Sequence, residues 1–349
     1  MTAVAATNPE SDATVLERLH DLIAWSWGAL TPELKDGRTD PTFVFPYLAS
    51  QANTFYFELH FEDARVVRTD FLQQAPLNPG ASVANPSVDP ILASMSRWYA
   101  GGDTAARCHH TTWLELDGPL QDSGADRRQG VSVCLDPHFG TPAEEDPLLY
   151  ARSASHLVSV FERLQQACAA TPQGAPVLGR ASDAAVTSGG LVRHVSVMRG
   201  RPGAPSKLYA SLTKPTFPRF LRDIAWPGDL SEAERFAGVV CTESKRVNCD
   251  LEFTNQLTER IGFEIFNDPS PAFDLRRRAA TDRALAMGLI STVQVAGLES
   301  WVGLFRKQLG NQRWPTRIQR WFDVKFVIHP GGRREFKAYL GFRLREGIF

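Results

Sequence analysis

Two runs of alternating apolar and polar side chains occupy residues 321–344, one on each side of a Pro-Gly-Gly turn. Successive side chains of a strand point to opposite faces, so this pattern predicts a β-hairpin. One face is apolar, and the other carries Lys325, Lys337, Tyr339 and Arg343. A chain built from such hairpins must bury the apolar face against a second layer.

Four earlier segments show the same alternation, and helical patterns separate the hairpins. The sequence therefore predicts an α+β fold of repeated helix–hairpin units with about ten antiparallel strands. Such a sheet tends to curl when helices cover one face, and closure removes its exposed edges. We expect either a barrel whose polar faces line a lumen or two duplicated sheets covered by helices.

The expected strands and longer helices can be given by residue number. The hairpins are 54–61 with 65–72, 111–117 with 130–136, 193–199 with 206–212, 248–254 with 260–267, and 321–344. A first helix is expected from residue 12, and longer helices at 147–170, 272–288 and 296–308.

Part of the chain is repeated. The pattern Lys207-x-Tyr209 returns as Lys337-x-Tyr339 about 130 residues later, and the strands upstream of both share further similarities. We interpret this as an internal duplication of 100–215 onto 240–349. The sequence favours a single domain over 12–349, after an N-terminal segment, 1–11, that is expected to be disordered.

Composition narrows the class of protein. Hydrophobic residues make up 43% of the chain and charged residues 22%, as in globular proteins. A net charge of −1 gives no general attraction to nucleic acid or to an anionic membrane. Five irregularly spaced cysteines, no signal peptide and no long apolar run predict a cytoplasmic protein. The excess of Arg over Lys suggests a bacterial source.

The polar strand faces carry residues that could bind an anion and move a proton. Converging lysines and an arginine are typical of diphosphate binding, and aromatic faces can stabilise a carbocation. A strand glutamate can accept a proton. The candidates for substrate binding are Lys207, Tyr209, Lys325, Lys337, Tyr339, Arg343, Tyr56 and Trp113, and the candidate catalytic bases are Glu115 and Glu252, with Glu58 as a further possibility.

The repeated hairpins and the Lys-x-Tyr patterns at 207–209 and 337–339 resemble the ABBA-type aromatic prenyltransferases. The resemblance implies a central barrel that binds an isoprenoid diphosphate through Lys and Arg, shielded by tyrosines. It implies transfer of the isoprenoid to an aromatic or peptide acceptor in secondary metabolism, without a cofactor. An Asp-rich DDxxD motif is absent from the sequence, which fits a reaction with little or no dependence on magnesium.

A second interpretation stays open because the fourth hairpin is acidic, with Asp250, Glu252 and Glu264. Carboxylates that pair with the lysines would make the polar faces structural. The chain would then be a non-catalytic accessory protein of natural-product peptide biosynthesis that binds a substrate peptide or a partner enzyme. The run Cys108-His109-His110 lacks further ligands at zinc-site spacing, so no metal site is expected.

Overall fold

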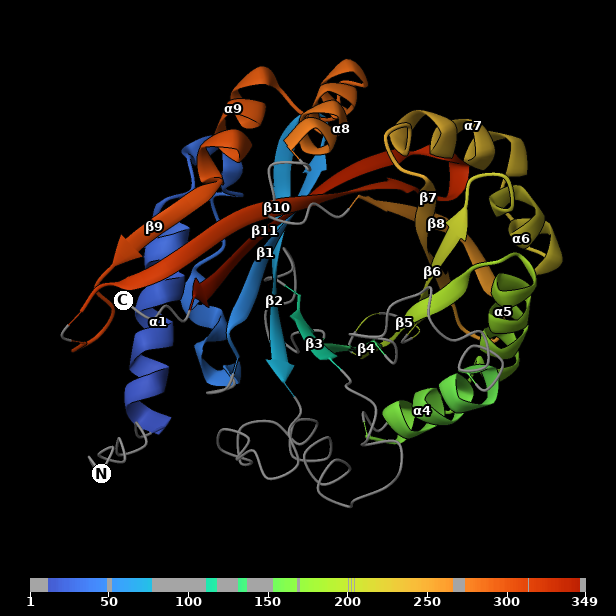
Figure 1. The fold of residues 1–349 in the computed structure, drawn as a ribbon, viewed down its shortest axis with the longest axis horizontal. Coiled ribbons are helices and arrows are strands. Elements are labelled where there is room, and N and C mark those ends of the chain that lie inside the picture. Colours follow the sequence, from blue (N-terminus) through green and yellow to red (C-terminus); the bar gives the residue numbers. More distant parts are fainter. Residues whose placement is uncertain are drawn as a thin grey trace, which may run out of the picture.

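The computed structural model describes residues 12–48, 52–76, 111–117, 131–136, 153–167, 170–199, 201, 203, 205–265, 274–312 and 314–345. The described strands form one curled sheet, and the helices lie around its outside (Figure 1). The strands are β1 (Thr54–Glu62), β2 (Arg65–Pro76), β3 (Thr111–Leu116), β4 (Val131–Asp136), β5 (Leu191–Arg199), β6 (Ser206–Thr213), β7 (Arg246–Phe253), β8 (Leu257–Ile265), β9 (Gly303–Lys307), β10 (Thr316–Ile328) and β11 (Arg334–Arg345).

From α4 onward the described helices come in pairs, and each pair lies between two hairpins in the sequence. Helices α4 and α5 precede β5, α6 and α7 precede β7, and α8 and α9 precede β9. Two short 3₁₀ segments, η1 (Pro32–Leu34) and η2 (Pro41–Tyr47), lie between the first helix and the first strand. The helices are α1 (Asp12–Gly28), α4 (Ser153–Ala167), α5 (Ala175–Thr187), α6 (Phe217–Asp223), α7 (Leu230–Val240), α8 (Asp274–Ala286) and α9 (Thr292–Trp301).

Antiparallel pairing closes ten of the strands into a ring. Strands β1 to β8 pair in sequence order, β8 pairs with β10, and β10 pairs with β11. The ring closes because β11 pairs with β1 from Thr54↔Arg343 to Phe61↔Phe336. Strand β9 pairs with the first part of β10 and lies outside the ring. We call the space enclosed by the ten strands the lumen.

A tight turn joins the strands of the first hairpin, whose register then shifts at an irregularity between His60 and Phe61. Strands β1 and β2 are joined through Asp63 and Ala64, whose φ angles are 48° and 54°. Positive φ at both central residues is typical of a type I′ turn, whose twist matches that of the flanking strands. The last hairpin instead turns through Gly331 and Gly332, at φ 77° and 80°, where glycine adopts this conformation without strain.

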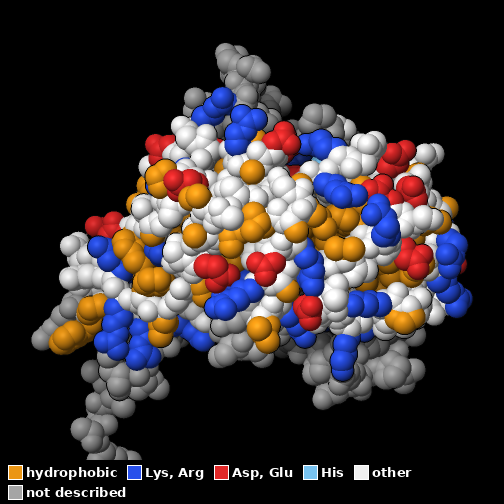
Figure 2. All heavy atoms as spheres, turned by 90° about the horizontal axis from the view of Figure 1, so that it is seen from above, with side chains coloured by type: hydrophobic (Ala, Val, Ile, Leu, Met, Phe, Trp, Pro, Cys, Tyr) orange, Lys and Arg blue, Asp and Glu red, His pale blue; other side chains and the backbone are white. Residues whose placement is uncertain are grey.

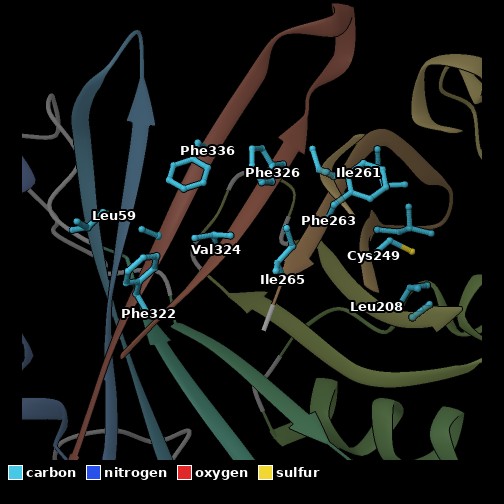
Figure 3. Packing of buried hydrophobic residues seen from close by; sticks show 14 of the residues in the cluster. Leu59, Leu208, Cys249, Ile261, Phe263, Ile265, Phe322, Val324, Phe326 and Phe336 are labelled. Atoms are coloured by element: carbon cyan, nitrogen blue, oxygen red, sulfur yellow. The ribbon is translucent and has the colours of Figure 1, made fainter. Parts of the chain in front are cut away.

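The outer face of the sheet and the inner faces of the helices form one apolar layer. Figure 3 shows buried side chains of this layer on β1, β6, β7, β8, β10 and β11. The ring of Phe263 on β8 lies 5.8 Å from that of Phe217 on α6 and 5.7 Å from that of Phe236 on α7. Burial of this layer drives the helices onto the sheet and turns the polar strand faces inward.

A buried arginine joins α1, α9 and β9 to the sheet. The guanidinium of Arg320 on β10 lies 3.8 Å from the ring centre of Trp25, 4.4 Å from that of Trp301 and 4.7 Å from that of Phe305. Burial lowers the pKa of Arg320 to about 10. The three aromatic rings supply the cation–π attraction that holds this charge in an apolar layer.

The strands of the five predicted pairs do pair with each other, and the α+β class is confirmed, while the repeated helix–hairpin unit stays a prediction. The predicted helix at 296–308 is wrong in its second half, because α9 ends at Trp301 and 303–307 is a strand. Helix α5 was not predicted. The internal duplication stays a prediction, and segments 1–11, 147–152 and 108–110 lie outside the described residues.

Charge on the face drawn in Figure 2 is mixed. Lys and Arg side chains alternate with Asp and Glu over the face drawn in Figure 2, with apolar side chains between them. None of the helices in the described part of the chain has the length and apolar character needed to cross a membrane.

We predict that Phe263→Ala lowers the free energy of unfolding by about 3–5 kcal/mol, because it removes a fully buried ring and leaves a cavity between α6, α7 and the sheet. Urea unfolding followed by circular dichroism measures the change. The control is Leu275→Ala on α8, where the side chain is 77% exposed and the change should stay within about 0.5 kcal/mol. Equal effects of the two substitutions would contradict this assignment of the core.

Candidate functional site

The lumen contains a cavity of about 160 Å³. This volume holds several water molecules or a small organic group. Seven of the ten predicted site residues line the cavity, and Lys337, Arg343 and Glu252 are not among its lining residues. The lining residues are Tyr56, Glu58, Leu72, Trp113, Glu115, His194, Ser196, Lys207, Leu208, Tyr209, Asp250, Glu264, Asp323, Val324, Lys325 and Tyr339.

Lys325 is held by two carboxylates. Its Nζ atom lies 2.8 Å from Asp250 Oδ1 and 2.8 Å from Glu264 Oε1, and Arg260 donates to the other oxygen of Asp250 at 2.9 Å. Burial opposes the charge of Lys325, but the attraction of Asp250 and Glu264 outweighs it and raises the pKa of the ammonium. Lys325 is therefore a charged member of an ion-pair network.

A glycine makes room for this network. Gly262 on β8 pairs with Asp250 in the sheet, and a Cβ atom at this position would lie 1.8 Å from Asp250 Oδ1 and 2.5 Å from Lys325 Cε. Any larger residue would displace the buried ion pair. The sequence pattern alone does not reveal this role, because Gly262 resembles any glycine within a strand.

Lys337 is held by a second network at another part of the lumen. Its Nζ atom donates to Glu58 Oε1 at 2.7 Å, and His60 lies between Asp70 at 2.8 Å and Glu335 at 2.6 Å. Burial opposes ionisation of Glu58, but Lys337 and then His60 hold the pKa of Glu58 well below its ordinary value. The pKa of Asp70 is lowered to about 2, because attraction to His60 and Arg68 outweighs its burial.

The carboxylates of this second network offer metal-ligand atoms. One atom each from Glu58, His60 and Asp70 lies within 4.8 Å of the others. Arg68 donates a hydrogen bond to Asp70 at 2.6 Å, and Lys337 donates one to Glu58 at 2.7 Å. Two cations already neutralise this cluster, so its donor set fits an ion-pair network rather than a metal site.

A third ion-pair network, formed by Arg201, Glu115 and Asp117, lies near Lys207. Arg201, just beyond β5, donates to Glu115 at 2.5 Å and to both oxygens of Asp117, at 2.5 Å and 2.9 Å. Burial opposes ionisation of Glu115, but Arg201 lowers its pKa, so the carboxylate stays ionised at neutral pH. Arg201 was not predicted, because it follows β5 and lies outside the alternating pattern.

Lys207 differs from the other two lysines of the lumen. It lies on β6, lines the cavity and is half-buried. Within the part of the chain that the structure describes, its ammonium group has no hydrogen bond or ion pair. Burial first, and then the cation of Arg201, lower the pKa of Lys207 to about 8.

Aromatic rings form another wall of the cavity. The ring of Tyr56 lies 5.3 Å from that of Trp113 and 5.5 Å from that of Trp321. The ring of Tyr209 stacks on His194 at 5.1 Å. Burial raises the pKa of Tyr56, Tyr209 and Tyr339 well above the ordinary value, so these phenols are neutral at physiological pH.

Besides Lys337, two predicted site residues do not line the cavity, Arg343 and Glu252. Arg343 donates to Gln319 at 3.1 Å and 2.9 Å, and its guanidinium lies 5.3 Å from the ring centre of Trp321. Glu252 pairs with Lys207 in the backbone register of β6 and β7, yet is not among the cavity-lining residues. Of the predicted bases Glu115 and Glu252, only Glu115 lines the cavity, and Glu58, the further possibility, lines it as well but accepts a hydrogen bond from Lys337.

We predict that Lys337→Met lowers the free energy of unfolding by about 3–5 kcal/mol, because it leaves Glu58 buried without its main cation. The double substitution Lys337→Met with Glu58→Gln should recover part of this loss. Arg219→Met, which removes an exposed pair with Asp223, serves as the control and should change stability by less than about 1 kcal/mol. A loss no larger than the control would contradict the assignment of a buried pair.

No protein-family model matches this chain, and no curated protein matches it either. What the lumen can bind is therefore inferred from its own side chains.

Proposed function

We propose that this barrel is a prenyltransferase-like enzyme that transfers an isoprenoid from its diphosphate to an aromatic or peptide acceptor within the lumen. The observation that carries the proposal is the cavity itself. It brings Lys207, whose ammonium has no ion-pair partner among the residues that the structure describes, together with the aromatic wall of Tyr56, Trp113 and Tyr339. An anionic leaving group and an allylic cation need these two features side by side.

Each part of the cavity has a role in this reaction. Lys207 binds the diphosphate, and the allylic carbon–oxygen bond breaks with both electrons leaving on the diphosphate. The neutral tyrosine rings and Trp113 shield the allylic cation from water. The acceptor forms the new bond to carbon, and its proton passes to Glu115, which is ionised and faces the cavity.

The other predicted cations are already paired or lie apart from the cavity, and of these only Lys325 lines it. Lys325 and Lys337 are neutralised by carboxylates, and Arg343 contacts Gln319 and Trp321. Arg201 lies close enough to Lys207 for its charge to lower the pKa of that lysine, but Glu115 and Asp117 already neutralise Arg201. The expected anion site is therefore centred on Lys207 alone rather than on a cluster of three lysines and an arginine.

We predict that isothermal titration calorimetry detects binding of dimethylallyl diphosphate or geranyl diphosphate, with release of diphosphate when Trp- or Tyr-containing acceptors are added. Lys207→Met should weaken binding about tenfold to a hundredfold, because a charged hydrogen bond contributes about 1.5–3 kcal/mol. Lys214→Met is the control, since this lysine donates to the Thr242 carbonyl away from the cavity. Absence of binding and of release across the acceptor panel would refute the proposal.

A second candidate function is favoured by the paired lysines. Three ion-pair networks neutralise most of the charge in the lumen, as in a structural core. An accessory protein that binds a substrate peptide or a partner enzyme without turnover fits this balance. Binding of a Trp- or Tyr-containing peptide, with neither affinity for either diphosphate nor release, would support this function over the enzyme.

A further inference from the structure

The environment of Lys207 differs from that of every other lysine in the chain. The sequence contains seven lysines, and all of them lie in described segments. Lys325 and Lys337 are fixed by carboxylates, and Lys214 donates to a backbone carbonyl. Lys245 and Lys307 are exposed. The remaining one, Lys35, lies over the ring of Trp27 at 5.8 Å.

Charged groups approach Lys207 from the strands around it, and the cations among them oppose its charge. Burial has the largest effect on its pKa, followed by Arg201, and Arg260 and Lys325 act in the same direction while Glu115 opposes them. Lys207 in turn lowers the pKa of Glu58 on β1 and of Asp250 on β7. The pKa of about 8 leaves about a quarter of the amine neutral at pH 7.5, against about one part in a thousand for an ordinary lysine.

A neutral amine that faces a cavity is a nucleophile toward carbonyl carbon. The groups that this reaction needs are present. Tyr209, two residues along the same strand face, is a neutral phenol that can donate a proton, and the carboxylate of Glu115 can accept one. Tyr56 and Trp113 supply a wall against which an aromatic or other planar group can pack.

We propose that Lys207 is a nucleophilic lysine that binds an aromatic aldehyde or ketone covalently, as an imine, inside the barrel. The nitrogen lone pair attacks the carbonyl carbon, and the carbonyl oxygen takes up a proton to give a carbinolamine. Loss of the nitrogen proton and of water then gives the carbon–nitrogen double bond. One amine and one carbonyl are consumed, and one imine and one water are formed, so no oxidant or reductant is needed.

This activity is independent of the proposed prenyl transfer. It uses the same amine, but in its neutral form and without a diphosphate. Lys207→Arg separates the two activities, because arginine keeps the positive charge that a diphosphate needs and has no amine able to form an imine.

The test is reductive labelling of the full-length protein with benzaldehyde and sodium cyanoborohydride at pH 7.5, with the modified lysines located by peptide mass spectrometry. We expect Lys207 to be labelled at least about tenfold faster than exposed Lys245, because a larger fraction of its amine is neutral. The rate at Lys207 should reach half its maximum near pH 8. Lys207→Arg should lose the fast label, and the control Lys214→Arg should keep it.

Labelling of Lys207 no faster than that of Lys245, or a midpoint at the pH of an ordinary lysine, would overturn the proposal. Both readouts come from the wild-type chain, so they hold even if a variant at Lys207 fails to fold. Neither uses a diphosphate or an acceptor, so failure of the imine test and failure of the prenyl-transfer test are separate results.

Discussion

Pairing of charges inside a closed sheet is the constraint on which the rest of this molecule depends. Helices cover the apolar outer face, so every polar strand face must point into the lumen. Charges there are removed from bulk water, and a buried charge without a partner would cost several kcal/mol. The lumen meets this constraint with three networks, centred on Lys325, Lys337 and Arg201.

These networks also explain why one amine remains available. Lys207 lies among Arg201, Arg260 and Lys325, whose carboxylate partners are already occupied. A further cation in this position can reduce its electrostatic cost by losing its proton, which arginine does not do and lysine does. The same arrangement that stabilises the barrel therefore leaves Lys207 both reactive and accessible from the cavity.

Much of the fold could be predicted because alternation of side chains is a local property. The five hairpins and the direction of each strand face follow from residues within about ten positions of one another. Strand β9 was mistaken for the end of a helix because five residues are too few to establish a period. Among the proposed site residues, Lys207, Tyr209, Tyr56, Trp113, Lys325, Tyr339 and Glu115 face the cavity as the alternation predicts.

The sequence by itself determined that the chain forms amphipathic hairpins whose lysines, tyrosines and glutamates share one side of the sheet. Only the tertiary structure decided which charges meet. Glu58 and Lys337 are separated by 279 positions, and they become partners because β11 closes on β1. Lys207 and Lys337 carry the same local motif, yet Lys337 is paired with Glu58 whereas Lys207 has no ion pair within the described segments. Strand neighbours alone do not explain the difference, because β7 places Glu252 opposite Lys207 in the register while β1 places His60 opposite Lys337. It depends on how the closed ring brings side chains together, which the local pattern does not fix.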